Sequence, residues 1–486
     1  MGSTMASFTL ISVLLPEIIL VLLGFILLAL DVFLSKRNRA LMGWVTVIGL
    51  TASAVAGVML SKASSGDPLV WGGMLRLDTA ARVFRILFLT GAAITALLSV
   101  EEESLSGQGE FYFLLVISTL GFTLLASSAD LIMVYLSLEM ASIPLYILAG
   151  FNFRDSRSVE AGLKYMLYGA VASAIMLFGF TFLYGFSGTT QLYLISAAIQ
   201  NGQVPVLATT AAGMLILVGL GFKISAVPFH FWAPDVYEGA PTTVAGFLST
   251  VSKAGGFAVL LRLGVTVFPV LSVYSVYLIA AMAVASMLVG NLLALNQKNF
   301  KRFLAYSSIA QAGYILVGVA ARSDLGSAGV IYYLMAYLVT NLVAFGIAFI
   351  IEHITGSNEI HGLAGLSQRR PFLGFALLIS LLSLGGIPPF AGFIGKLLVF
   401  SAGVQSGMAW LVVIAVLNSV ISLYYYLNVL KVAFLDKPRE FTPVQAKSVS
   451  WRLAFLLCLI GILVLGVVMA PWFGWSMTAA SSLILY

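Results

Sequence analysis

The chain has 486 residues, of which 60% are hydrophobic and only 9% are charged, and its mean hydropathy is +1.05. This composition excludes an ordinary soluble globular protein and predicts a polytopic helical membrane protein. The formal net charge of +6 comes from basic residues scattered among loops, so it indicates no nucleic-acid partner.

Cysteine and histidine are too scarce to hold redox centres. Cys458 is the single cysteine, which excludes an internal disulfide and a cluster held by cysteines. Of the three histidines only His230 lies near an apolar run, so a haem held by two intramembrane histidines is excluded. We therefore expect no metal and no cofactor in this chain, and any electron carriers would belong to other chains.

Fourteen apolar runs are long enough to cross a bilayer. The first run follows no positive segment and is too long for a signal peptide, so we expect a retained span, with Met1 or Met5 as the native start. The runs lie near residues 10–34, 41–60, 77–99, 111–126, 131–151, 161–185, 207–229, 241–265, 271–293, 302–320, 328–351, 371–400, 407–433 and 452–475.

The basic residues of the loops predict the orientation in the membrane. With the N-terminus outside, the inward loops hold fifteen Lys and Arg and the outward loops hold three, so the positive-inside rule places both termini on the outer side. The inward residues are Lys36, Arg37, Arg39, Arg154, Arg157, Lys298, Lys301, Arg302, Arg369, Arg370, Lys431, Lys437, Arg439, Lys447 and Arg452, and the outward residues are Lys62, Arg76 and Arg322.

The segment GFKISAVPFHFWAPDVYEGAPTT, from Gly221 to Thr243, predicts a broken helix. Pro228 has no amide hydrogen and its ring clashes with the preceding turn, so the helix should open just beyond Lys223 and free the carbonyl of Ile224. An unpaired lysine in hydrocarbon is costly, and a lysine beside a helix break is typical of a water-lined ion path. We therefore interpret Lys223 as a functional residue.

Further charged residues fall inside spans. Glu139 lies within the fifth span, where it either pairs with Lys223 two spans later or neutralises a neighbouring arginine. Glu160 and Lys164 lie four residues apart at the start of the sixth span, an arrangement that structure alone explains well. Lys253 lies in the eighth span among small residues, which let helices approach closely.

Two further polar groups are less distinctive. Arg82 and Arg85, with Asp78 one turn earlier, are predicted to form a cluster at the membrane interface or at a contact with another chain. In the tenth span, the polar side chains between Tyr306 and Tyr314 could hold a chain of ordered waters, and polar packing between helices explains them equally well.

A second broken helix is predicted in LSLGGIPPFAGFIGK, which ends at Lys396. Pro388 and Pro389 should free the carbonyls of Leu384 and Gly385. Lys396 lies about two turns beyond, on roughly the same face. A second helix break with a second buried lysine is hard to ascribe to chance.

Spans four to eight and nine to thirteen thus form two five-span units, each with its broken helix as the fourth member. An odd number of spans reverses the orientation, so the units form an inverted repeat, as in many transporters. The predicted fold class is an all-α polytopic membrane protein of about 14 transmembrane helices with broken helices 7 and 12. The predicted divisions are residues 1–105, 106–268, 269–435 and 436–486.

Five segments carry a resemblance to a known family: LLPEIIL from Leu14, YLSLEMASIPLYILAG around Glu139, AGLKYMLYGAVASA around Lys164, the segment from Lys223 to Lys253, and LSLGGIPPFAGFIGK. The chain resembles the antiporter-like membrane subunits of respiratory complex I, and among them the subunit N family, whose mitochondrial counterpart is subunit 2. The Pro-Pro pair before Lys396 is typical of subunit N. The L-type relative carries a long C-terminal lateral helix, whereas this chain stops at Tyr486.

The resemblance implies a proton-translocating subunit of NADH:quinone oxidoreductase in the bacterial plasma (inner) membrane. NADH, FMN, iron-sulfur clusters and quinone would be bound by partner subunits, and the neighbours would be M-type and K-type subunits. The implied residue roles are a coupled pair (Glu139 and Lys223), a connecting residue (Lys253), a terminal proton site (Lys396) and supporting members (Glu160, Lys164, His230 and Tyr306).

Two alternatives stay open. The chain could be a cation/proton antiporter subunit without a redox partner, against which the Pro-Pro motif argues. It could instead be a structural spacer, against which the presence of both broken helices with both lysines argues. The electron donor of the complex, NADH or ferredoxin, and the type of quinone also stay open.

Overall fold

A computed structural model describes residues 13–34, 40–59, 69–100, 102, 105, 107–268, 273–437 and 449–483. Six of the basic residues on which the predicted orientation depends lie outside these ranges. They are Lys36, Arg37, Arg39, Lys62, Arg439 and Lys447.

Within this described part, 13 helices are long and apolar enough to cross a membrane. Two shorter apolar helices, α17 (Pro371–Gly385) and α18 (Ala391–Gln405), together form the remaining predicted span, so the fourteen spans are confirmed. The other spans are α2 (Leu15–Phe33), α3 (Ala40–Met59), α4 (Thr79–Ser99), α5 (Gly109–Ser127), α6 (Leu131–Ala149), α7 (Ser156–Ser187), α9 (Val206–Ile224), α11 with η2 and α12 (Thr242–Phe247, Leu248–Ser252 and Lys253–Thr266), α13 (Val273–Ala294), α14 (Phe300–Ala320), α15 (Asp324–Thr355), α19 (Ala409–Leu435) and α20 (Val449–Val467).

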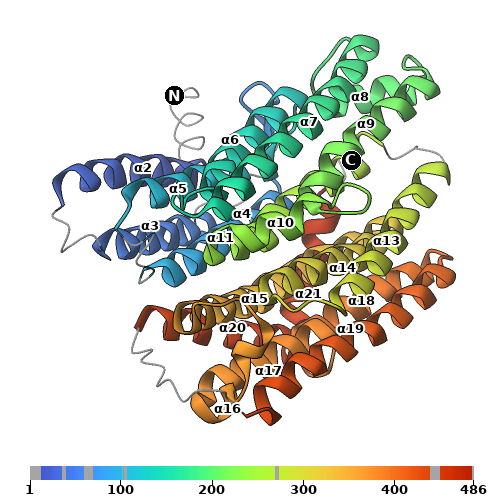
Figure 1. The fold of residues 1–486 in the computed structure, drawn as a ribbon. Helices are drawn as coiled ribbons and strands as arrows, with labels where there is room; N and C mark the ends of the chain where they lie inside the picture. Colours follow the sequence, from blue (N-terminus) through green and yellow to red (C-terminus); the bar gives the residue numbers. More distant parts are fainter. Residues whose placement is uncertain are drawn as a thin grey trace.

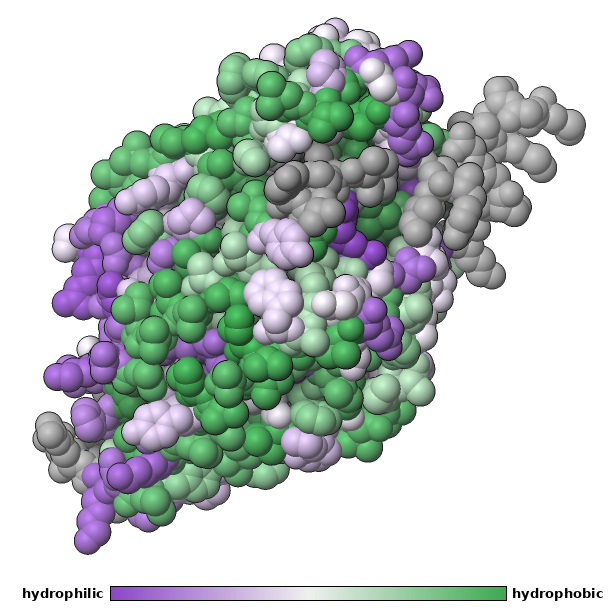
Figure 2. Space-filling view, turned by 90° about the vertical axis from the view of Figure 1, so that its right-hand side faces the viewer, coloured by the Kyte–Doolittle hydropathy of each residue, from purple (hydrophilic) through white to green (hydrophobic). Residues whose placement is uncertain are grey.

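The helices run side by side along one common direction (Figure 1). The first unit, α5 to α12, and the second unit, α13 to α19, lie next to each other across this direction. The units meet where α10 (Trp232–Gly239) packs on α14 and α11 packs on α15. Figure 2 shows that hydrophobic residues cover most of one face, while hydrophilic residues gather mainly along its left-hand margin. This surface is what a multi-pass membrane protein presents to lipid.

Both predicted helix breaks are confirmed. Helix α9 ends at Ile224 and Ser225 adopts the left-handed conformation (φ 55°), so the chain crosses to α10 without continuing the helix. Helix α17 ends at Gly385, and Gly386 (φ 83°) supplies the left-handed residue that is common at a helix C-terminus. The prolines that follow each break lack the amide hydrogen that would prolong the preceding helix.

The freed carbonyls find side-chain donors. Gln311 Nε2 donates to the Leu384 carbonyl at 3.1 Å, and Lys396 Nζ donates to the Gly385 carbonyl at 3.1 Å. At the first break, the Phe222 carbonyl keeps a backbone partner, the Ser225 amide, and also accepts a hydrogen bond from Trp232 Nε1 at 3.0 Å. A buried carbonyl without a partner would be costly, so these donors stabilise the two breaks.

The sequence did not predict five short elements or the break before α21. Helix α8 (Leu192–Gln200), helix α16 (Leu366–Arg369) and the 3-10 turn η3 (Ile360–Leu363) lie between spans. The strands β1 (Leu69–Val70) and β2 (Leu75–Arg76) pair antiparallel between the second and third spans. The run predicted as the last span divides at Val468 into α20 and α21 (Met469–Ser482), because Pro471 lacks the amide that the carbonyl at 467 would need.

Helix α4 lies deep in the bundle and contacts helices of both units. It packs against α5, α11 and α12 of the first unit and against α15 of the second. It also contacts the C-terminal helices α20 and α21. The third span, which lies outside the repeat, therefore joins the two units from one side.

We expect Gly466→Ala to destabilise the contact between α20 and the second break. An added Cβ would lie 2.0 Å from the Pro389 carbonyl oxygen, so the two segments must move apart, at a cost of about 1–3 kcal/mol. The reactivity of the buried Cys458 thiol during heating of the purified protein measures this effect, because Cys458 is the single cysteine. Gly474→Ala is the control, since nothing lies within 4 Å of its added Cβ. Equal unfolding midpoints for the two variants would contradict the close packing at Gly466.

Candidate functional site

The buried basic residues of the described ranges fall into two groups. Four of them lie within 4.0 Å of a carboxylate: Arg76, Arg85, Arg262 and Lys301. The other three, Lys223, Lys253 and Lys396, are between 1% and 4% exposed and form no such ion pair within the described part of the chain. A buried ammonium group without a carboxylate is expensive, so these three positions need a separate explanation.

The paired arginines link helices that are distant in the sequence. Arg85 Nε lies 2.8 Å from Glu17 Oε1 and joins α4 to α2. Arg262 binds both carboxylate oxygens of Asp78, at 2.8 and 3.0 Å, and joins α12 to the start of α4. The predicted cluster of Arg82, Arg85 and Asp78 at the membrane interface or at a contact with another chain does not form as one group. Arg85 and Asp78 are buried, and each is paired within the chain, Arg85 with Glu17 and Asp78 with Arg262.

Lys223 is held by a hydroxyl group. Its Nζ donates to Ser142 Oγ at 2.7 Å and lies 5.3 Å from the centre of the Phe122 ring. Glu139 lies three residues before Ser142 on α6, so the two share one helix face, and its carboxylate accepts a hydrogen bond from Ser173 of α7. Glu139 and Lys223 are thus close in the fold, but they do not form a direct ion pair in this conformation.

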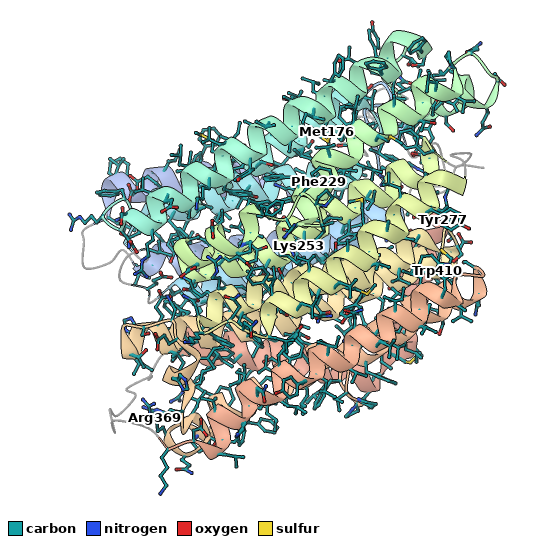
Figure 3. The ribbon with its side chains drawn as sticks, turned by 45° about the vertical axis from the view of Figure 1, so that its right-hand side comes forward. Met176, Phe229, Lys253, Tyr277, Arg369 and Trp410 are labelled. Carbon is teal, nitrogen blue, oxygen red and sulfur yellow. The ribbon has the colours of Figure 1, made fainter. Side chains whose placement is uncertain are left out.

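Lys253 lies near the middle of the molecule, well away from Arg369 at one end and Trp410 at the other (Figure 3). Its Nζ donates to the carbonyl and to the hydroxyl of Ser308, at 2.8 and 2.9 Å. The π-helical turn η2 directly precedes Lys253. Such turns inside α-helices occur frequently at functional sites.

Lys396 lies next to the second break. In addition to the Gly385 carbonyl, its Nζ donates to Ser419 Oγ of α19 at 2.8 Å. The same ammonium lies 4.7 Å from the centre of the Tyr314 ring, a distance at which the electron-rich ring face attracts a cation. The predicted proximity of Lys396 to a freed carbonyl is confirmed, whereas Lys223 turns to a hydroxyl instead.

A series of polar groups leads from Lys253 to Lys396. In two places, between Ser308 and Ser307 and between the Leu384 and Gly385 carbonyls, the link is adjacency along the chain and not a hydrogen bond. Ser307, next to the Ser308 that binds Lys253, bonds Tyr426 of α19 at 2.5 Å. Gln311 donates to Tyr426 at 3.2 Å and also to the Leu384 carbonyl, which adjoins the carbonyl that binds Lys396. We call these groups the polar chain, and it consists of Ser308, Ser307, Tyr426, Gln311 and the carbonyls of Leu384 and Gly385.

Lys164 takes part in a larger ionic network than the sequence predicted. Its Nζ lies 2.7 Å from both Glu160 Oε1 and Asp235 Oδ2. Arg302 continues the network with 2.8 Å contacts to Asp235 and Glu238. The network joins α7, α10 and α14, and its members are partly exposed, so each pair contributes modestly to stability.

The structure places the other two predicted supporting residues differently. His230 lies buried in the break between α9 and α10, and its Nδ1 has no hydrogen-bond partner among the described atoms. Tyr306 is buried on α14, between one and two turns before Gln311. Among the hydrogen bonds of the described residues, none joins the Tyr306 side chain to the polar chain. His230 therefore lies at the same helix break as Lys223, whereas Tyr306 lies apart from the polar chain.

The sequence interpretation missed the hydroxyl and amide partners of the lysines. Ser142, Ser173, Ser419 and Tyr426 were not singled out, although each interrupts an apolar span with a polar side chain. In α15, Asn341 donates to Ser249 of η2 at 2.7 Å, which gives the eleventh span a polar contact to the first unit. Within the described residues, no group of three or more His, Cys, Asp or Glu side chains is placed to hold a metal ion.

The three lysines can accept and release protons without a fixed counterion. A hydroxyl group can accept a hydrogen bond from an ammonium and donate one to a neutral amine, so the same partner suits both protonation states. Burial favours the neutral amine, whereas an approaching carboxylate favours the ammonium. Small movements of charge can therefore change the proton occupancy of these sites.

We expect Asp78→Asn to be far more destabilising than Asp235→Asn. The first change keeps the cap that Asp78 gives to Ala81 but leaves the buried Arg262 without its carboxylate, at a cost of about 3–5 kcal/mol. The second change weakens a network in which Lys164 and Asp235 are each 36% exposed, at a cost of at most about 1 kcal/mol. Thermal exposure of the Cys458 thiol ranks the two variants. Similar losses would show that the burial of the Arg262 pair has no energetic weight.

Comparison with known proteins supports one family. The family model described as NADH:quinone oxidoreductase/Mrp antiporter, transmembrane, matches residues 128–422. NADH-quinone oxidoreductase subunit N of Dehalococcoides mccartyi is 44% identical over 465 residues, which cover 93% of this chain and 94% of that protein. NAD(P)H-quinone oxidoreductase subunit 2 of a Nostoc species is 41% identical over 475 residues, which cover 94% and 91% of the two chains.

Solved structures agree with the sequence relatives. A chain of respiratory complex I from Thermus thermophilus with bound aureothin superposes with a TM-score of 0.80 at 34% identity, covering 94% of this chain and 98% of that chain. Together with the matched family model and the two sequence relatives, this likeness shows that the chain belongs to the subunit N family of NADH:quinone oxidoreductase, or respiratory complex I.

Proposed function

We propose that this chain is a proton-translocating subunit of a NADH:quinone oxidoreductase, in which partner subunits reduce quinone. The observation that carries the proposal is that Lys223, Lys253 and Lys396 are buried without a carboxylate, while the other buried cations of the described ranges are paired. The polar chain between Lys253 and Lys396 supplies a route for protons. A purely structural role would not require charged side chains at these costly positions.

The first step would be a change in the distance between Glu139 and Lys223. With Glu139 bonded to Ser173, Lys223 has only neutral partners, and burial favours release of its proton. A carboxylate that moved toward Lys223 would favour the ammonium and load a proton. Ser142, which binds Lys223, lies one turn from Glu139 on α6, so rotation of the Glu139 or Lys223 side chain could bring the carboxylate to the ammonium.

The second step would carry the proton from Lys253 to Lys396. Hydroxyl and amide side chains along the polar chain can relay a proton by exchanging hydrogen bonds, with waters where two groups do not touch. Moving one charge against about 100 mV costs about 2.3 kcal/mol. Pairing and unpairing of buried charges can supply energies of this size.

The remaining assignments follow from the family. We propose that NADH, FMN, iron-sulfur clusters and quinone are bound by partner subunits, and that M-type and K-type subunits flank this chain in a bacterial inner membrane. Both termini would lie on the outer side, as the positive-inside bias indicates. The divisions 1–105, 106–268, 269–435 and 436–486 stay a proposal about how the two units and their flanking helices function.

The antiporter alternative has weaker support. A chain of the Mrp complex from Dietzia sp. DQ12-45-1b superposes with a TM-score of 0.82, but at 22% identity this likeness shows the fold alone. The relatives above 40% identity are subunits of quinone oxidoreductases. A redox-coupled pump therefore fits the chain better than an antiporter that works without a redox partner.

We expect Lys223→Ala and Lys396→Ala to lower proton pumping to below about a tenth of the wild-type value, because each removes a proton-binding site. The measurement is acidification of proteoliposomes that contain the assembled complex, with quinone reduction followed in parallel. Lys431→Ala is the matched control, because Lys431 is exposed on α19. Normal pumping by both buried-lysine variants would support the spacer alternative.

We expect Gln311→Leu to reduce pumping several-fold while the complex still assembles. The leucine has a similar size, but it removes the contacts to Tyr426 and to the Leu384 carbonyl and so interrupts the polar chain. Gln297→Leu is the control for the loss of a side-chain amide. Among the described residues, the side-chain amide of Gln297 bonds only the Leu293 carbonyl, at an exposed position. If the two variants pumped equally well, the polar chain would not be the proton route.

A further inference from the structure

A polar pocket of about 780 Å³ opens at the end of the bundle that the positive-inside bias assigns to the inside. The end of α10, the start of α14 and the end of α15 form its walls, and residues 356–359 close one side. Its rim carries Arg157 and Lys298, two of the basic residues that predict this orientation. The residues that line the pocket are not members of the polar chain, and they take no part in the proposed proton transfers between Lys223, Lys253 and Lys396.

An ion pair lies at the floor of this pocket. Lys301 is 3% exposed, and its Nζ lies 3.6 Å from Glu352 Oε1 and donates to the Ala240 carbonyl at 2.9 Å. Glu352 is 35% exposed, so its carboxylate also faces the pocket. It accepts hydrogen bonds from Thr242 of α11 and from Asn358. The pair thus connects the pocket to the helix that leads to Lys253.

Both members of the pair carry the charge that their own helix end disfavours. Lys301 is the second residue of α14, where the positive end of the helix dipole opposes an ammonium. Glu352 lies in the last turn of α15, where the negative end opposes a carboxylate. With Lys301 and Glu352 both uncharged, neither helix end would meet an unfavourable charge, so the two helix dipoles lower the cost of a neutral pair. A pair chosen for stability alone would have the opposite arrangement.

Most of the other charged groups around the pair are carboxylates. Glu102 and Glu238 face Lys301 from the segment before α5 and from α10, and both carboxylates favour its ammonium form. Asp155, Arg157, Lys298, His353 and Glu359 line the outer part of the pocket. Burial of Lys301 opposes its ammonium form, whereas these carboxylates favour it.

The path from this pair toward Lys253 is short but apolar. Helix α11 and η2 lead from Thr242 to Lys253 over eleven residues, which is roughly 16 Å of helix. Phe247 and Phe345 lie buried along this path, and the side chain of Phe345 packs against the backbone of Gly246. A proton that leaves Lys301 would therefore pass these buried aromatic rings before it reaches the polar contacts around Asn341 and Lys253.

We propose that Lys301 and Glu352 form a proton-loading site at which this chain takes up protons from the inner aqueous phase. A hydronium ion in the pocket gives its proton to the Glu352 carboxylate and leaves as water, so the pair becomes an ammonium beside a neutral acid. Lys301 then gives its ammonium proton to a water on the bundle side, which leaves both groups of the pair uncharged. The acid proton of Glu352 then passes to Lys301, and this transfer restores the original ion pair. This inference rests on the proposed function, because it supplies the protons that Lys253 would receive.

The test compares Glu352→Gln, Glu359→Gln and wild type in the assembled complex, reconstituted in proteoliposomes. Protons moved per quinone reduced are measured while the pH on the inner side is varied from 6 to 9, a range about the ordinary values of titratable side chains. We expect Glu352→Gln to lower this ratio at least about threefold at the alkaline end, because proton capture becomes limiting. Glu359→Gln, at the exposed rim, should match wild type.

Three further variants separate the explanations. Glu352→Asp keeps the carboxylate and should restore most of the wild-type pH profile, which a role limited to packing would not explain. If Glu352→Gln does not assemble, the double variant Lys301→Gln with Glu352→Gln removes both charges and should assemble but show the same alkaline loss. An unchanged ratio and pH profile in the Gln variants would overturn the loading site. Loss of pumping by Lys396→Ala in the same preparation would show that the proposed function still stands.

Discussion

The high cost of burying a lysine without a carboxylate is the constraint on which the rest of this structure depends. Lys223, Lys253 and Lys396 each meet that cost with neutral partners, a hydroxyl group in every case. At Lys396 the second partner is a carbonyl that the Pro-Pro break releases from its helix. The break and the lysine therefore depend on each other: the break would leave unsatisfied carbonyls without the polar side chains, and without the break Lys396 would lose one of its two acceptors.

The ion pairs of the chain divide by their chemistry. The buried arginines are paired with carboxylates and join helices that are distant in the sequence, as Arg85 with Glu17 and Arg262 with Asp78 do. An arginine does not lose its charge under ordinary conditions, so such pairs are suited to holding helices together. A lysine can lose its charge when it is buried. Among the buried Lys and Arg residues in the described part of the chain, those that form no ion pair with a carboxylate are all lysines. The choice of cation therefore separates permanent links from sites that can change their charge.

Much of the fold follows from local properties of the sequence. The fourteen spans could be predicted because hydropathy and length suffice to recognise a span, and the two breaks because proline acts on the turn that precedes it. The carbonyls of Leu384 and Gly385 were predicted for the same reason, and both bind side-chain donors. The hydroxyl partner of Lys223 and the second partner of Lys164 could not be predicted, because Ser142 and Asp235 reach these lysines only through the rotation and depth of separate helices. The same limit explains the wrong prediction for Arg85, whose partner lies on the first span.

Helix α4 sets a limit on how the molecule can move. Many transporters built from inverted repeats expose their site alternately by rocking one unit against the other. Here α4 packs against the first unit and the second at once, and buried ion pairs attach it to α2 and α12. A rocking motion would have to break these contacts in each cycle. The membrane barrier in this chain is therefore best opened and closed by side-chain rotation and the entry of water within a rigid frame, which would allow several such subunits to stand side by side without straining one another.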